Sequence, residues 1–270
     1  MKQQVVICGY GWLGGYLGTS LQRGNTIIGT VRNKEKATLL NKQGITAIQY
    51  TLGDDTGILC HYLKDATLVL NIPPGRKNND LADFSSNMCS LINDAIAAGV
   101  AHILFISTTS VYGDSTENTV TEYSATHPES ASAKAHVAIE HHLSSLADKV
   151  KVSIVRLAGL VGPDRHPAYS LSGRTVSAGN KRVNLVHIND VVDALRTIIS
   201  SPSAQSLYVL CSTSHPKRGE YYTQAAQALH ILPPEFSDTQ LAPCGKVVDA
   251  TQSWRALNLA PVYASPFDMY

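Results

Sequence analysis

Short apolar runs rich in β-branched residues alternate with longer segments of helical length in the first part of the chain. The runs are QQVVIC, NTIIGTV, ATLVLNI, AHILFIS and VKVSIVRL. Runs that are apolar throughout are typical of strands buried on both faces, as in a parallel sheet between two layers of helices. The pattern predicts an α/β fold with a doubly wound parallel sheet.

The rhythm changes after Leu157, where loops marked by glycine and proline appear in GLVGPDRHP and AGNKRVN. A helix at INDVVDALRTIIS and a strand at SLYVLC then continue the earlier alternation, whereas the remainder is polar and rich in turns. We therefore expect two parts: residues 1–159 with 185–211 as a sheet domain, and residues 160–184 with 212–270 as a smaller substrate-binding lobe.

Composition narrows the functional classes. Twenty-two Lys and Arg residues against 21 Asp and Glu residues give a net charge of +1, and no like-charged run exceeds two residues. This balance argues against a nucleic-acid or membrane surface. The five cysteines are scattered and form no Cys-x-x-Cys pair, and the N-terminus shows no secretion signal. We expect a cytoplasmic protein without a disulfide framework or a metal site.

A glycine-rich turn directly follows the first predicted strand in CGYGWLGGYLGTSL. Gly9, Gly11 and Gly14 fit the pattern G-x-G-x-x-G, with Trp12 and Leu13 opening the next helix. In such a turn the glycines permit a tight bend and a close approach of the backbone to a pyrophosphate, and the helix N-terminus adds partial positive charge. Residues 9–14 are thus predicted to bind a dinucleotide; the alternative is a turn that binds nothing.

The end of the second strand bears on which dinucleotide is bound. It reads Thr30, Val31, Arg32, Asn33, without the acidic residue that usually bonds the ribose 2′-hydroxyl of NAD. An arginine there can pair with the 2′-phosphate of NADP. NADP(H) is therefore favoured over NAD(H), with Arg32 as its contact; the alternative is that Arg32 is a solvated loop charge.

Further motifs follow in order along the chain. ISTTSVYGD ends a predicted strand, Lys134 and Glu140 lie in the helix after it, and IVRLAGLVGP and VNLVHINDVV come later. Together with the glycine turn, they resemble the extended short-chain dehydrogenase/reductase superfamily, in an atypical, NAD-dependent epimerase/dehydratase-like branch. The resemblance implies a Rossmann fold and an NAD(P)-dependent oxidoreductase or nucleotide-sugar epimerase/dehydratase-like enzyme.

The resemblance also implies roles for single residues. Thr108 would bond the substrate oxygen, and Lys134 would hold the nicotinamide ribose and activate a tyrosine four residues earlier. That position is Ser130, whose aliphatic hydroxyl is a much poorer base than a phenol. The nearby groups that could supply the proton instead are Tyr112, the first choice, Tyr123 and His127.

Other residues receive expectations from their place in the family pattern. Pro73 and Pro74 would stiffen a loop over the dinucleotide. Arg165, His166 and Arg174 fall where the family builds its substrate pocket and suit an anionic ligand, such as a nucleotide-sugar. Structural roles are expected for Arg156, as an ion-pair partner, and for His187 and Asp190, which would join the lobe to the core. His136 and Glu140 lie four residues apart but are interpreted as a solvated helix face, not as metal ligands.

Two functions stay open. The first is the NADP(H)-dependent enzyme, which would act on a carbonyl or hydroxyl carbon by hydride transfer. The second is a non-catalytic NADP(H) sensor or regulatory protein, which the missing tyrosine favours. The resemblance also suggests a homodimer through helices near residues 85–98 and 134–147.

Overall fold

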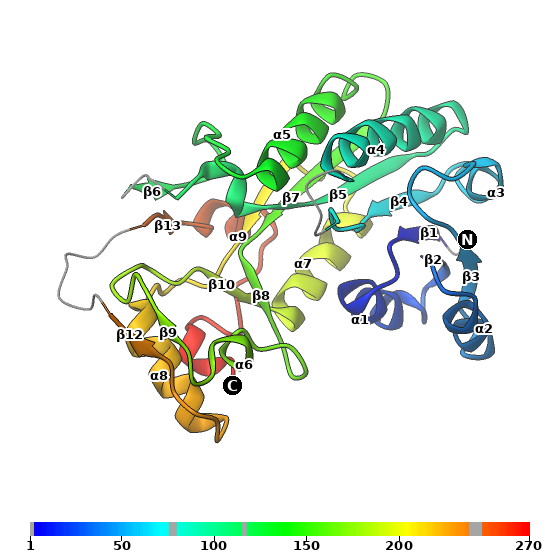
Figure 1. Cartoon of the computed structure of the whole chain (residues 1–270). Coiled ribbons are helices and arrows are strands. Elements are labelled where there is room, and N and C mark those ends of the chain that lie inside the picture. The colour runs from blue at the N-terminus through cyan, green and yellow to red at the C-terminus, as the bar shows by residue number, and fades with distance from the viewer. Residues whose placement is uncertain (1–2, 76–79, 115–117, 238–244) are drawn as a thin grey trace.

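A seven-stranded parallel sheet forms the centre of the chain in the computed structural model, which describes residues 3–75, 80–114, 118–237 and 245–270 (Figure 1). The strand order is β11-β7-β5-β4-β1-β2-β3. In chain order the strands are β1 (Gln3–Cys8), β2 (Asn25–Val31), β3 (Thr46–Gln49), β4 (Thr67–Leu70), β5 (His102–Thr108), β7 (Lys151–Leu157) and β11 (Leu207–Leu210).

Helices cover both faces of this sheet. One face carries α1 (Trp12–Leu21), α2 (Lys34–Lys42), α7 (Ile188–Ser200) and α9 (Thr251–Ala256). The other carries α3 (Gly57–Cys60), α4 (Asp80–Ala97) and α5 (Ala131–Ser144). The predicted doubly wound α/β fold is confirmed. Among the described residues, no helix is both long and apolar enough to cross a membrane.

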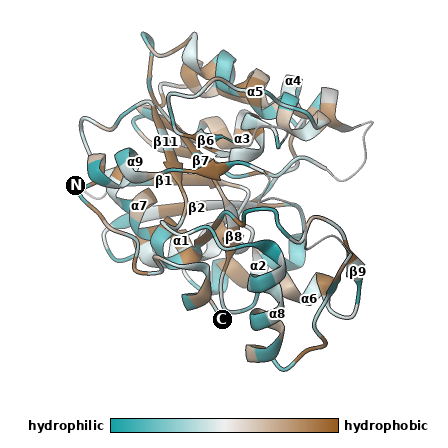
Figure 2. Ribbon diagram, turned by 90° about the vertical axis from the view of Figure 1, so that its left-hand side faces the viewer, coloured by the Kyte–Doolittle hydropathy of each residue, from teal (hydrophilic) through white to brown (hydrophobic). Residues whose placement is uncertain are grey.

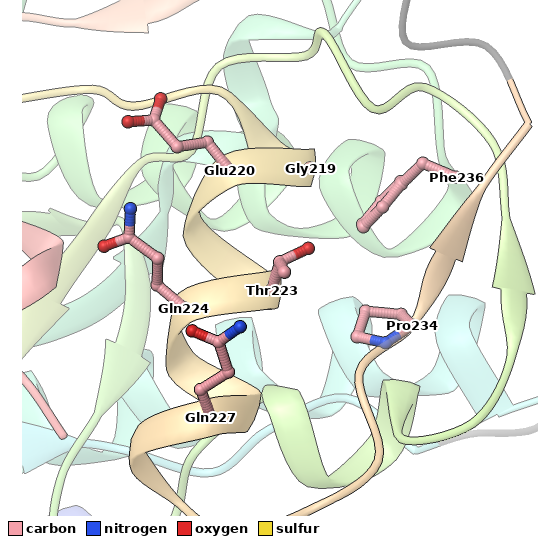
Figure 3. A pocket seen from close by; sticks show the side chains of 7 residues that line it. All are labelled: Gly219, Glu220, Thr223, Gln224, Gln227, Pro234 and Phe236. Carbon is pink, nitrogen blue, oxygen red and sulfur yellow. The ribbon is translucent and has the colours of Figure 1, made fainter.

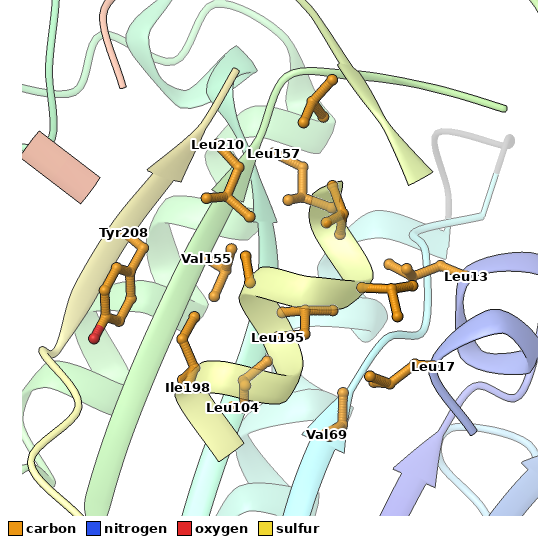
Figure 4. Packing of buried hydrophobic residues seen from close by; sticks show 14 of the residues in the cluster. Leu13, Leu17, Val69, Leu104, Val155, Leu157, Leu195, Ile198, Tyr208 and Leu210 are labelled. Atoms are coloured by element: carbon orange, nitrogen blue, oxygen red, sulfur yellow. The ribbon is translucent and has the colours of Figure 1, made fainter. Parts of the chain in front are cut away.

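The alternation of side chains along the strands explains the continuous apolar runs. In β1, Val5 and Ile7 pack on the α1 and α7 side, while Val6 and Cys8 pack on the α4 and α5 side, and all four are fully buried. A strand between two helical layers needs apolar residues at every position. Figure 4 shows one layer, in which Leu195 and Ile198 of α7 face the sheet, and Figure 2 shows the resulting hydrophobic centre.

The smaller lobe has its own apolar cluster. It contains β8 (Gly159–Val161) paired with β10 (Leu185–His187), β9 (Thr175–Val176) paired with β12 (Glu235–Phe236), α6 (Ala168–Leu171), α8 (Arg218–Ala228) and η2 (Pro266–Asp268). Tyr221 and Tyr222 of α8 fill the middle of the cluster with Val161, Val183 and Met269. Figure 1 shows α6, α8, β9 and β12 gathered together, away from α2 and α3.

One stretch of the C-terminal region belongs with the sheet. The polar, turn-rich pattern predicts residues 212–270 in the small lobe, but β13 (Val247–Val248) pairs with β6 (Thr119–Val120). The Ser253 Oγ of α9 accepts a hydrogen bond from the Val209 N–H of β11 at 2.8 Å, and Trp254 Nε1 donates to the Cys211 carbonyl at 2.9 Å. Val248, Trp254 and Leu257 join the apolar cluster on this face of the sheet, and the polar, turn-rich composition around them does not reveal it.

Tyr10 fills the space between α1 and β2. A Cβ atom at Gly18 would lie 2.1 Å from the Tyr10 hydroxyl oxygen, and one at Gly29 would lie 2.5 Å from Tyr10 Cδ2. The ring is therefore held between two glycines, one on each element. The close helix and strand packing next to the glycine turn depends on both.

We predict that Gly29→Ala destabilises the protein by about 1–3 kcal/mol, because the added methyl collides with the buried Tyr10 ring. Urea unfolding measures the effect. Gly24→Ala is the control, since a Cβ atom there meets nothing within 4 Å. Equal stability of the two variants would show that the Tyr10 ring moves aside freely.

Candidate functional site

The glycine turn uses its three glycines in different ways. Gly9 has φ +95°, and a Cβ atom on it would lie 2.6 Å from the Asn71 carbonyl oxygen. A Cβ atom on Gly14 would lie 2.8 Å from the Gly9 carbonyl oxygen. At Gly11 the nearest atom is 3.9 Å away. Gly9 and Gly14 are therefore required by packing, whereas Gly11 borders open space.

Neighbouring strands hold this turn through side chains that the sequence pattern did not single out. Thr30 Oγ1, near the end of β2, accepts from the Gly9 N–H at 2.9 Å, and its carbonyl accepts from the Tyr10 N–H at 2.8 Å. Asn71, directly after β4, donates from Nδ2 to the Gly9 carbonyl at 3.0 Å. Both residues come from the two strands that flank β1 in the sheet, β2 and β4.

The N-terminus of α1 suits an anion. Gly11 is its N-cap and provides no side-chain hydrogen bond, and the first turn carries no acidic residue. The first N–H groups of a helix have no partner within the helix, and the helix dipole adds positive potential there. Together with the open space at Gly11, these features fit the pyrophosphate of a dinucleotide.

Arg32 and the two prolines lie beside this turn in the sheet order. Arg32 follows β2, is exposed, and its guanidinium has no hydrogen-bond or ion-pair partner within the described ranges. The next residue, Asn33, caps α2 by accepting from the Lys36 N–H at 2.8 Å. Pro73 is exposed and Pro74 half-buried, in the loop that leaves β4 after Asn71.

Thr108 lies at the carboxyl end of β5, at the start of η1 (Thr109–Tyr112). Its Oγ1 accepts from the Ser110 N–H at 3.1 Å and contacts Ser110 Oγ at 3.1 Å. The side chain is half-buried, so its hydroxyl is oriented by the turn while still reachable.

A buried polar network lies below Thr108. Arg156 Nη2 pairs with Glu140 Oε2 at 2.6 Å, and Ser107 Oγ donates to Glu140 Oε1 at 2.5 Å. Arg156 Nη1 also donates to the Tyr112 hydroxyl at 2.9 Å. The prediction that Arg156 serves in a structural ion pair is confirmed.

Tyr112 is part of that network and is fully buried. Burial raises the pKa of Tyr112 above its ordinary value, and the charge of Arg156 opposes this rise only in part. A sealed phenol already bonded to Arg156 has no path to a substrate. Its placement speaks against the expected role of Tyr112 as proton donor.

Helix α5 places the expected pair Ser130 and Lys134 outward. Ser130 Oγ caps the helix by accepting from the Ala133 N–H at 3.1 Å, and Lys134 is exposed. Successive residues of a helix are about 100° apart, so Lys134 points about 160° away from His136. The side of α5 that contacts β5 and β7 carries His136 and Glu140, because Glu140 bonds Ser107 and Arg156.

The expectation that His136 and Glu140 form a solvated face is wrong, since both are buried. The His136 ring stacks on Phe105 at 5.8 Å and lies 6.0 Å from the Phe84 ring. Its Nδ1 is 2.8 Å from the Ser132 carbonyl, which only accepts, so Nδ1 carries the hydrogen. Burial lowers the pKa of His136 and keeps the ring neutral.

The three lobe residues expected to bind substrate separate in the structure. Arg165 is exposed and stacks over the Trp12 ring at 5.3 Å, and Arg174 is exposed on the lobe surface. His166 is buried: its Nδ1 accepts from the Ala168 N–H at 3.2 Å, and its Nε2 donates to the Tyr221 hydroxyl at 2.8 Å. His166 is thus a core residue of the lobe, and a substrate-binding role does not fit it.

Two lysines of the C-terminal half attach to the turn after Tyr112. Lys246 Nζ donates to the Gly113 carbonyl and lies 3.0 Å from Asp114 Oδ1, while Lys181 Nζ is 2.5 Å from Asp114 Oδ2. Burial alone raises the pKa of Asp114, but the hydrogen bonds from both lysines outweigh it and lower the pKa. Lys181 is accordingly a structural cation.

His187 and Asp190 also join the two parts, as predicted. Asp190 accepts from the Val262 N–H at 2.8 Å and from the Tyr263 N–H at 3.1 Å. The His187 ring stacks on the Tyr263 ring at 3.5 Å.

The glycine turn, Thr108 and the later motifs match a known family along most of the chain. A model of the NAD dependent epimerase/dehydratase family matches residues 5–211. The chain belongs to this family. The predicted relationship to the short-chain dehydrogenase/reductase superfamily is thereby confirmed at the level of the epimerase/dehydratase family, whose cofactor is a nicotinamide dinucleotide.

Known relatives extend the match to the full length. Protein YeeZ of Escherichia coli strain K12 is 32% identical over 274 residues, covering 99% of this chain and 98% of the relative. A UDP-glucuronic acid 4-epimerase from Bacillus cereus, solved with NAD, superposes with a TM-score of 0.82 at 14% identity, covering 99% of this chain and 96% of that one. A UDP-glucose 4-epimerase from Thermotoga maritima, solved with UDP-glucose, gives 0.81 at 16% identity, covering 96% and 94%. At such low identities these structures show the shared fold.

A hollow of about 440 Å³ lies elsewhere on this epimerase/dehydratase-family chain, along α8 (Figure 3). Its lining residues are Gly219, Glu220, Thr223, Gln224, Gln227, Pro234 and Phe236. It includes none of the residues discussed above, so the site is argued from the glycine turn. Within the described ranges, no group of three or more His, Cys, Asp or Glu side chains is placed to hold a metal ion.

Acid should destabilise the protein through its buried histidines. Burial lowers the pKa values of His166 and His102 to about 4, from 6.5 in the unfolded chain. Between these values the unfolded chain binds more protons, so stability falls as the pH drops from about 6.5 to about 4. Urea unfolding at pH 7 and pH 5 should show a smaller loss for His166→Gln than for wild type. Exposed His141→Gln is the control, and equal losses in all three proteins would contradict the assignment.

Proposed function

We propose that the chain is an NADP(H)-dependent oxidoreductase or epimerase/dehydratase-like enzyme that acts on a carbonyl or hydroxyl carbon by hydride transfer. The observation that carries this proposal is the glycine turn. Gly9 and Gly14 are fixed by packing, Gly11 borders open space, and the uncapped N-terminus of α1 faces the same place. This geometry supports binding of a pyrophosphate by residues 9–14, with Trp12 and Leu13 in the first helical turn.

The preference for NADP(H) rests on Arg32. Its guanidinium is exposed just beyond β2, and residues 30–33 offer no carboxylate to a ribose 2′-hydroxyl. A 2′-phosphate would supply the anion that this cation lacks within the described ranges. The loop with Pro73 and Pro74 begins at Asn71, which bonds Gly9, and this connection supports its placement along the dinucleotide.

When bound, the dinucleotide supplies or accepts a hydride. Thr108 would hold the substrate oxygen, with Oγ1 oriented by the Ser110 N–H. Ser130 is used as a helix cap and Tyr112 is sealed, so neither is proposed to move the proton. Tyr123 and His127 are both exposed in the loop after Thr108, and we propose that one of them exchanges a proton with the substrate.

The substrate is proposed to be a small anionic molecule of the nucleotide-sugar kind. The solved T. maritima epimerase holds UDP-glucose, and this chain shares its fold. Arg174 offers an exposed guanidinium on the small lobe for a phosphate or carboxylate. A homodimer through α4 and α5 is part of the same proposal.

Lys134 is exposed, and we propose that it holds the nicotinamide ribose with either function. The absence of a tyrosine four residues before it favours the second candidate, a non-catalytic NADP(H) sensor. A sensor would bind NADPH and NADP+ with different affinity, or change its association state with the redox ratio. Equal affinities together with substrate-dependent NADPH oxidation that falls on Thr108→Ala would exclude it in favour of the enzyme.

We predict that Gly11→Ala weakens binding of NADPH and NADH by about tenfold or more while the fold is kept, because the methyl occupies space that only a ligand would use. Calorimetric titration measures the affinity, and urea unfolding should show a loss of about 1 kcal/mol or less, the usual cost of alanine at a helix N-cap. Gly24→Ala, which also adds a methyl in open space, is the matched control. If the Gly11 variant binds both cofactors as tightly as wild type, the proposal that this turn binds the pyrophosphate is wrong.

Arg32→Ala should weaken NADPH binding by about tenfold and leave NADH binding unchanged, because only NADPH carries the 2′-phosphate. The same titration compares both cofactors. Lys34→Ala removes an exposed cation two residues later and serves as the control. If wild type binds NADH as tightly as NADPH, the NADP preference fails although the dinucleotide site stands.

A further inference from the structure

A turn of the small lobe lies directly on the glycine turn through Trp12. Residues Gly162 and Arg165 exchange backbone hydrogen bonds of 3.0 and 3.1 Å, which close the turn. A Cβ atom on Gly162 would lie 2.8 Å from Trp12 Cη2 and 2.6 Å from Ile188 Cγ2. The indole therefore packs against bare backbone, and no larger residue would fit at Gly162.

Arg165 extends from this turn over the indole. Its guanidinium carbon is 5.3 Å from the centre of the Trp12 ring, a cation–π arrangement. The residue is exposed, and no carboxylate lies within ion-pair distance of it in the described part of the chain. The aromatic contact orients the guanidinium but leaves its five N–H donors available.

No acidic side chain is bonded to Arg165 or Trp12 within the described ranges. Trp12 is the first residue of α1, whose N-terminus is uncapped by any side chain and has no acidic residue in its first turn. Its own Nε1–H is buried and has no acceptor within the described ranges. Asp164, in the same turn as Arg165, is exposed and makes no ion pair with it, so the guanidinium beside α1 is not neutralised by a carboxylate contact.

We propose that Arg165 is a phosphate-binding residue of the dinucleotide site, so that the small lobe contributes one cation to the cofactor. The inference rests on the proposed function and changes the expected partner of Arg165 from substrate to cofactor. The decisive observation is position: the guanidinium stacks on the residue that begins α1, where the pyrophosphate would lie. A planar guanidinium binds phosphate oxygens in pairs, which suits this geometry.

The contact would also connect the two parts of the protein. The 162–165 turn leads from β8 into α6, the first helix of the lobe. A phosphate bonded by both Arg165 and the α1 N-terminus would add a bridge to those made by Asp190 and Lys181. Cofactor binding should therefore stabilise the lobe as well as the sheet domain.

Calorimetric titration of NADPH into Arg165→Met tests the inference. Methionine keeps an apolar chain on the Trp12 ring and removes the charge. We expect binding about tenfold weaker than in wild type, and an intermediate affinity for Arg165→Lys, which keeps the charge but loses the planar pair of donors. Arg255→Met, which removes an exposed arginine of α9, should leave NADPH affinity unchanged.

The possible outcomes separate this inference from the function beneath it. If wild type binds neither NADPH nor NADH, the proposed function fails, and this inference with it. If wild type binds NADPH and Arg165→Met binds it equally well, only this inference is overturned. If Arg165→Met binds NADPH as wild type does, but its NADPH-loaded form binds UDP-glucose more weakly, Arg165 contacts the substrate and this inference is overturned. An equal loss in Arg165→Met and Arg255→Met would mean a general charge effect and would also overturn it.

Discussion

The buried ion pair between Glu140 and Arg156 holds together the elements that meet below the candidate site. It joins α5 to β7, and through Ser107 and Tyr112 it fixes the end of β5 and the turn that follows. Removing one partner of such a pair leaves an uncompensated buried charge, which costs about 3–5 kcal/mol. The position of Thr108, the residue proposed to meet the substrate, therefore depends on an interaction in which it takes no part.

The glycine turn depends in the same way on its neighbours. Thr30 and Asn71 reach it from the strands on either side of β1, and the Tyr10 ring sets the distance between α1 and β2. A turn built from glycines has little conformational preference of its own. Its shape is fixed by these contacts, which is why the open space at Gly11 is a property of the folded sheet and not of the motif alone.

The sheet and the glycine turn could be predicted because their signals are local. A strand buried on both faces shows an unbroken apolar run. A position with a positive φ, or with no room for a Cβ atom, is occupied by glycine and can be seen in the sequence. The inward side of α5 could not be predicted, since it carries His136 and Glu140, which local composition places in solvent. Their burial depends on Phe105 and Arg156, which lie far away in the sequence. The substrate-binding role predicted for His166 was wrong for the same reason, because its partner Tyr221 lies in α8, 55 residues later in the sequence.

The structure supports the residues proposed for cofactor binding better than those considered for proton transfer. The groups proposed to meet the cofactor, the α1 N-terminus with Arg32 and Arg165, have no carboxylate partner in the described ranges. Of the groups considered for proton transfer, Ser130 is a helix cap and Tyr112 a sealed phenol, whereas Tyr123 and His127 are exposed. Cofactor affinity thus draws on features that the fold already holds in place, whereas proton transfer must rely on exposed loop residues or on solvent. A general base must lie within hydrogen-bond distance of the proton that it removes, and an exposed loop holds its side chains less firmly than a packed core. For the enzyme, we therefore expect tight dinucleotide binding together with slow turnover.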